Sequence, residues 1–156
     1  MVYEDPNGHF AATPVAQRIL DLIEKHADEL TKSWLVEIRE DDATPTYGRF
    51  ADDAELYRRA HRVFGQLGKW INRDFSKEDI RTYWTGVGEQ RRREGFPLSE
   101  IVQSLGLIRK HFWSKVETEG FLDTGSDMYQ AMDLHNRVTL FFDRAIYYAV
   151  VGFEKA

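Results

Sequence analysis

The spacing of apolar positions predicts a long final helix that carries two hydrophobic stripes. Between Asp127 and Phe153, one stripe recurs at three-four spacing and consists of Ala131, Leu134, Val138, Phe141, Ala145 and Tyr148. A second stripe beside it consists of Phe142, Ile146, Ala149, Val150 and Phe153. A surface helix needs one apolar stripe to reach its own core. The second stripe therefore predicts a second packing partner, either another helix of the same domain or a second copy of the chain.

Helical periodicity also covers most of the chain before this final helix, and strand signals are nearly absent. Thr13 and Pro14 are typical of a helix start, with threonine as the N-cap and proline at the first helical position. The apolar face that follows predicts a first helix that runs to about Arg39. Residues 41–50 contain a proline and a glycine and are predicted to form a loop.

Three more helices are predicted between this loop and the final helix. The second begins at residues 52–53, where two aspartates can act as caps. The third begins at Ser76, which has an acidic residue three positions on, and it ends at Gly95, which suits a left-handed C-cap. The fourth follows Pro97. The connecting turns are predicted at residues 72–75 and 120–126. The fold class is therefore all-α, either a five-helix bundle or a globin-like helical domain with a long C-terminal helix.

Composition and charge narrow the class of protein. The 156 residues are predicted to form a single domain, residues 1–156, and the net charge of −5 argues against a nucleic-acid binder. The chain has no cysteine, which excludes disulfides and thiolate metal sites. With no signal-peptide pattern in residues 1–10, this predicts a cytoplasmic protein. Residues 138–153 are shorter than the ~20 needed to span a bilayer and contain Asp143 and Arg144, so we expect no membrane insertion.

Four histidines are candidate ligands for haem or a metal, namely His26, His61, His111 and His135. No two of them have the i, i+4 spacing that places two ligands on one helix face, and no Glu-x-x-His motif occurs. We therefore expect no metal site and no cofactor. Because a single helical histidine can ligate haem, a haem- or small-ligand-binding globin-like sensor is the alternative function. No residues stand in a catalytic arrangement, so an enzyme is not expected.

Two local features each have two interpretations. The run of arginines at 91–93 can contact phosphate or an acidic partner, but closing the third helix at its negative dipole end is favoured. Gly86, Gly88 and Gly106 lie inside predicted helices, where each costs about 1 kcal/mol relative to alanine. Close helix packing is favoured as the reason over room for a small ligand.

Residues 93–101 and Trp113 resemble the N-terminal domain of the RsbT co-antagonist family, of the RsbRD type. In that family a helix ends before Gly-x-Pro-Leu, and the next helix opens with an acidic residue and later carries a tryptophan. Asn136 and the pair Asp143-Arg144 resemble the final helix of the family. The resemblance implies a helical regulatory domain, related to globin-like modules without haem, that dimerises in front of an output module such as a STAS domain or a kinase. Because the sequence stops at Ala156 with no output module, we expect a sensor domain cut from a longer protein or a stand-alone relative.

The residue pattern and the resemblance agree on one mechanism, in which the final helix packs on its own domain and on a second copy. The resemblance implies a non-catalytic sensory or regulatory domain of the stress-response co-antagonist type. It would form a homodimer and relay a signal along its C-terminal helix to an output domain or a signalling partner. The predicted interface consists of Phe142, Ile146, Ala149, Val150 and Phe153. Replacing Ile146 or Val150 by glutamate is predicted to give a folded monomer.

Overall fold

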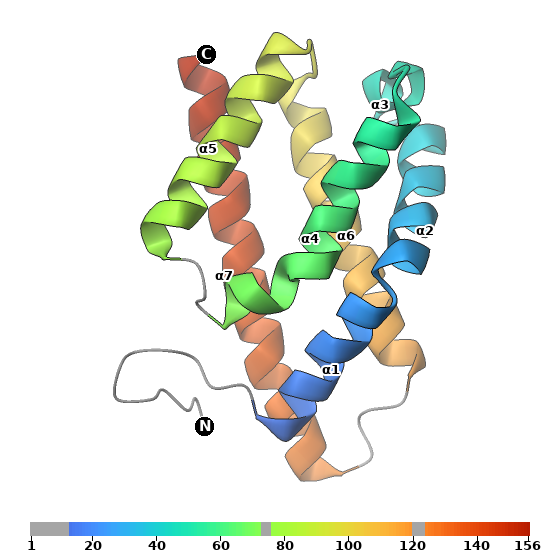
Figure 1. The fold of residues 1–156 in the computed structure, drawn as a ribbon, viewed down its shortest axis with the longest axis vertical. Helices are drawn as coiled ribbons and strands as arrows, with labels where there is room; N and C mark the ends of the chain where they lie inside the picture. Colours follow the sequence, from blue (N-terminus) through green and yellow to red (C-terminus); the bar gives the residue numbers. More distant parts are fainter. Residues whose placement is uncertain (1–12, 73–75, 120–123) are drawn as a thin grey trace.

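The computed structural model describes residues 13–72, 76–119 and 124–156, which form seven helices and no strand (Figure 1). The helices are α1 Pro14–Lys25, α2 Ala27–Glu40, α3 Pro45–Arg49, α4 Asp53–Ile71, α5 Lys77–Arg93, α6 Leu98–Thr118 and α7 Gly125–Lys155. The all-α class and the long C-terminal helix are confirmed. In the described part of the chain, no helix combines the length and the apolar character needed to cross a membrane.

The predicted first helix is two helices, and the prediction of one continuous helix to Arg39 was wrong. His26 leaves helical geometry with φ −102° and ψ 18°, so it ends α1 and precedes α2. The break directs α1 onto α4 and α7, whereas α2 packs on α4, α3 and α6. The apolar face continues across the break from Ile23 to Ala27, which are both buried. For that reason periodicity alone gave no sign of the bend.

The predicted loop at 41–50 contains the short helix α3. The side chain of Glu100 on α6 anchors its first turn, accepting hydrogen bonds from the backbone N–H of Thr46 at 2.8 Å and from the Thr46 hydroxyl at 2.6 Å. Tyr47 of α3 is buried against Phe96, with ring centroids 4.5 Å apart. A buried carboxylate and an aromatic contact, neither visible from local spacing, therefore convert the predicted loop into a helical turn.

Most other helix ends follow their predicted caps. Asp52 accepts a hydrogen bond from the Glu55 N–H at 3.0 Å and begins α4. Ser76 begins α5 with a reciprocal capping box, and Gly95 has the left-handed φ of +87° that the C-cap prediction requires. The final helix starts at Gly125, two residues earlier than predicted, because Thr124 is its cap. The predicted turns fall partly on residues 73–75 and 120–123, which lie outside the described residues.

Helix α7 runs along the whole domain and is about 46 Å long, given its 31 residues. In Figure 1 the C-terminal half of α7 lies beside α5, and the N-terminal half of α7 lies beside α1 and α6. Its first predicted stripe is the core face: Leu134, Val138 and Ala145 are fully buried. Helices α4 and α5 approach each other through long side chains rather than through backbone contact, and α6 is seen between them.

Candidate functional site

The closest helix pair in the structure is α5 with α7, and glycines make it possible. A Cβ atom at Gly88 would lie 1.8 Å from the carbonyl oxygen of Ala149, and one at Gly152 would lie 2.0 Å from the carbonyl oxygen of Thr85. No side chain fits at either position, so the two backbones touch directly. Close packing was the favoured explanation for Gly88, and it is confirmed.

The same explanation was wrong for Gly86 and Gly106. A Cβ atom at either position would meet no atom within 4 Å, leaving aside its own helix backbone. Gly86 is exposed and faces a groove between α4 and α5. Close approach of a neighbouring helix therefore accounts for only one of these three interior glycines.

The predicted interface residues of α7 fall into two groups. Phe142 and Ala149 are 0% and 1% exposed, so within this domain they are covered by its own helices. Ile146, Val150 and Phe153 are half-buried. The guanidinium group of Arg92 lies over the ring of Phe153, with 5.1 Å between the guanidinium carbon and the ring centroid. Part of the second stripe thus packs on α5, which was one of its two expected partners. Whether the half-buried part contacts a second copy stays a prediction.

A different face of α7, which the spacing of apolar residues did not indicate, exposes large apolar side chains. Met132, Leu140 and Tyr147 are 64%, 49% and 62% exposed, and their spacing places them on one side of the helix. Asn136 and Asp143 are exposed on the same side between them. Apolar and polar positions alternate along this side of the helix. The sequence therefore shows no continuous apolar stripe there. We call Met132, Asn136, Leu140, Asp143 and Tyr147 the outer face of α7.

The three consecutive arginines occupy the last turn of α5, as predicted, but each has a separate role. Arg91 is buried and points toward α4. Arg92 donates a hydrogen bond to the carbonyl oxygen of Phe153 at 2.7 Å and so joins the ends of α5 and α7. Arg93 is exposed and pairs with Glu89 at 3.6 Å. Only Arg91 therefore belongs to the interior.

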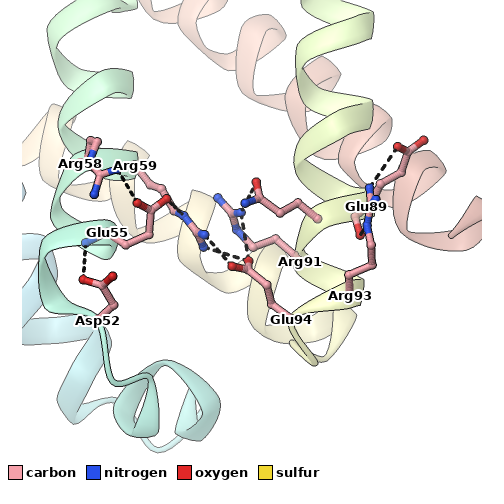
Figure 2. Close-up of polar contacts among 9 residues, drawn as sticks. Asp52, Glu55, Arg58, Arg59, Glu89, Arg91, Arg93 and Glu94 are labelled. Atoms are coloured by element: carbon pink, nitrogen blue, oxygen red, sulfur yellow. Dashed lines mark hydrogen bonds and ion pairs between the residues drawn. The ribbon is translucent and has the colours of Figure 1, made fainter.

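Arg91 is part of a charged cluster that joins α4 to the end of α5 (Figure 2). Arg59 of α4 forms a bidentate pair with Glu94, at 2.6 and 3.0 Å, and also binds Glu55 at 2.8 Å. Arg58 binds the second oxygen of Glu55 at 2.7 Å. The hydrogen bond from Arg59 lowers the pKa of the Glu55 carboxyl group. Burial, followed by the nearby charge of Arg59, lowers the pKa of the Arg91 guanidinium.

The histidines considered as ligands are distributed over the fold. His26 lies at the α1–α2 junction, 3.1 Å from Glu29, and His61 stacks on Tyr57 within α4. His111 on α6 and His135 on α7 contact Glu37 and Trp113, respectively. Among the residues that the structure describes, no group of three histidine or acidic side chains is placed to hold a metal ion.

A comparison with protein families gives one match. The family model described as the RsbT co-antagonist protein RsbRD N-terminal domain matches residues 28–156, from α2 to the end of α7. The match includes residues 93–101 and the Asn136 and Asp143-Arg144 positions, so the family resemblance seen in the sequence is confirmed. No curated protein and no solved structure matches the chain.

Proposed function

The chain belongs to the RsbT co-antagonist RsbRD N-terminal domain family, and from this premise we propose that it is a non-catalytic regulatory domain that acts as a homodimer through α7. It would bias a signalling partner or an output module of the stress-response co-antagonist type. A cytosolic setting is consistent with a chain that contains no cysteine.

The observation that supports the dimer most strongly is the outer face of α7. Three large apolar side chains there, Met132, Leu140 and Tyr147, are each about half exposed or more. Fully burying such a side chain contributes about 1.5–3 kcal/mol. The half-buried Ile146 and Val150 adjoin this face and belong to the predicted interface. We propose that the three exposed and two half-buried side chains form the centre of the dimer interface. Phe142 and Ala149 remain in the core of each copy.

Charge on this face suits a second copy of the chain better than an unrelated apolar surface. Asp143 on this face and its chain neighbour Arg144 are both exposed, and neither forms an ion pair with another described residue. In a two-fold dimer, each copy presents the same patch to the other. Asp143 of one copy can then pair with Arg144 of the other, twice over. Complementary charges across an interface contribute more to register than to affinity.

We propose that the α5–α7 contact carries a relay from the domain to its partner. Because the two backbones touch at Gly88 and Gly152, neither helix can slide without the other adjusting. The hydrogen bond from Arg92 to the carbonyl oxygen of Phe153 adds a second connection near the end of α7. We propose that a shift of α5 moves α7, and that α7 passes the movement to the dimer interface.

Cysteine scanning tests the dimer directly, because the chain has no cysteine of its own. Leu140→Cys, Asp143→Cys and Tyr147→Cys would be oxidised separately at low micromolar concentration. At least one of the three is expected to give a covalent dimer, since a residue near a two-fold axis meets its own copy. Val36→Cys is the matched control, because Val36 is an exposed valine on α2. Cross-linking of the control to the same extent, or of none of the three, would contradict the proposal.

A further inference from the structure

Four arginines line a groove between α4 and α5. It has a volume of about 320 Å³, and its lining includes Arg58, Arg59 and Arg62 from α4 and Tyr83, Gly86 and Arg91 from α5. Glu55 is the one carboxylate in the lining. This volume is at the lower end of the range typical of small-molecule sites. The groove therefore combines a suitable size with an excess of positive charge, in a chain whose net charge is negative.

Two of these arginines are poorly neutralised by the described residues. The Glu94 carboxylate forms short hydrogen bonds with Arg59. The distance from the Glu94 Oε1 atom to the Arg91 Nη1 atom is longer, at 3.4 Å. Arg91 is only 8% exposed, and a buried cation with a weak partner is costly. Arg62 lies over the ring of Tyr83, with 5.9 Å from the guanidinium carbon to the centroid, and has no ion pair with any carboxylate of the described residues. Arg62 is exposed to solvent and free to turn toward the groove, so an anion there would pair with it and would also face the buried charge of Arg91.

A cavity of about 40 Å³ lies behind the groove and shares Arg59, Tyr83 and Arg91 with it. Its wall includes Trp84, whose buried indole N–H has no hydrogen-bond partner among the described residues. The N–H of Trp34, in the same wall, is satisfied by the carbonyl oxygen of Ser104 at 3.1 Å. A buried donor without an acceptor costs about 1–3 kcal/mol. The groove thus lies next to a buried indole N–H whose surroundings a molecule bound in the groove would change.

We propose that the α4–α5 groove binds a small organic anion, with its carboxylate or phosphate group between Arg62 and Arg91 and its uncharged part against Tyr83 and toward Trp84. Guanidinium groups bind both kinds of oxyanion through paired N–H donors. Gly86 leaves space over α5 for the occupant, because no side chain projects there. Since α5 also packs on α7, occupancy of the groove has a physical path to the outer face of α7. The site itself does not rest on the proposed dimer.

The test is an NMR titration of the full chain at constant ionic strength, with the indole ¹H–¹⁵N signal of Trp84 assigned by Trp84→Phe. The probes are benzoate and phenyl phosphate, with uncharged benzamide and inorganic phosphate as controls. Benzoate, phenyl phosphate or both are expected to shift the Trp84 signal saturably, and which of them binds identifies the anionic group. Arg62→Gln is expected to weaken that binding at least tenfold. Arg93→Gln removes a charge from the same end of α5, outside the groove, and is expected to leave the affinity within twofold.

The proposal is overturned if neither organic anion gives a saturable shift. It is also overturned if benzamide or inorganic phosphate binds as well as they do, or if Arg93→Gln weakens binding as much as Arg62→Gln. Arg62 is used rather than Arg91 because Arg91 is buried and its loss can unfold the domain. The titration is repeated on a variant of the outer face, Tyr147→Glu, so that a failure to dimerise and a failure to bind are separate results.

Discussion

Gly88 on α5 lies directly against the backbone of Ala149 on α7, so close that a Cβ atom at position 88 would fall 1.8 Å from the Ala149 carbonyl oxygen. The contact is matched three residues further along α7, where Gly152 meets the carbonyl oxygen of Thr85. Each glycine is thus placed against the backbone of the other helix. Such packing leaves little freedom for sliding, and for this reason α5 and α7 are expected to move together.

The first prediction concerns this contact. Gly88→Ala would force the two backbones apart and is expected to lower the free energy of unfolding by about 2–3 kcal/mol, as overpacking in a well-filled core does. Gly86→Ala, two residues away, is the matched control. Its Cβ meets no atom within 4 Å, so the gain in helix propensity should raise stability by about 0.5–1 kcal/mol. Urea denaturation of both variants checks the pair, and equal effects of the same sign would contradict the direct backbone contact.

The second prediction concerns the charged cluster. Glu94→Gln would remove the carboxylate that Arg59 and Arg91 share and is expected to cost about 1.5–3 kcal/mol, because charge-assisted hydrogen bonds are lost while Arg59 keeps its bond to Glu55. Glu89→Gln removes a carboxylate from the exposed pair with Arg93 and should cost less than about 0.5 kcal/mol. Thermal and urea unfolding measure both changes. A Glu94 variant as stable as the Glu89 variant would show that the cluster does not stabilise the fold.

The third prediction concerns pH. Burial is the main reason that the pKa of His111 lies below its ordinary value of about 6.5, although Glu37 acts in the opposite direction. The unfolded chain therefore takes up a proton at a higher pH than the folded chain does. The contribution of His111 to stability is complete above about pH 6.5 and is lost as the pH falls toward the folded pKa. His111→Gln is expected to lose less stability than the unmodified chain between pH 7.5 and 5.5. Identical pH profiles from urea denaturation would refute this account of His111.

The sequence predicted those parts of the fold that depend on local chemistry. The caps at Asp52, Ser76 and Gly95 were visible because a cap uses residues within one turn of the helix end. The break at His26 was missed, since no glycine or proline marks it and the apolar face continues across it. The helix α3 was missed because the carboxylate that anchors it, Glu100, lies 54 residues further along the chain.

The candidate site was harder to predict for the same reason. The two apolar stripes of α7 were recognised, but which stripe faces α5 depends on where the backbones of the two helices touch, at Gly88 and at Gly152. The outer face of α7 mixes apolar residues with Asn136 and Asp143, so it resembles an ordinary solvated face in the sequence. The groove arises from Arg62 and Arg91, which come from different helices and have no relation in sequence spacing.

The fourth prediction concerns the half-buried part of the predicted interface. Ile146→Glu and Val150→Glu are each expected to give a folded monomer, because a carboxylate there would face the apolar surface of the second copy. Circular dichroism establishes that the variants remain helical. Val36→Glu on α2 is the control, since Val36 is an exposed apolar side chain outside α7, and it should leave the oligomeric state unchanged. Dimerisation retained by both α7 variants would exclude this part of the helix from the interface.

The most direct test of the central claim, that α7 joins two copies of the domain, is sedimentation velocity of the unmodified chain and of Leu140→Glu/Tyr147→Glu. The account predicts a species of twice 18.3 kDa for the unmodified chain and a folded species of 18.3 kDa for the double variant. A monomer in the unmodified chain at concentrations up to about 100 μM, well above the Kd of a weak specific dimer, would contradict it. A double variant that is still a dimer would also contradict it, because the interface would then lie elsewhere on the domain.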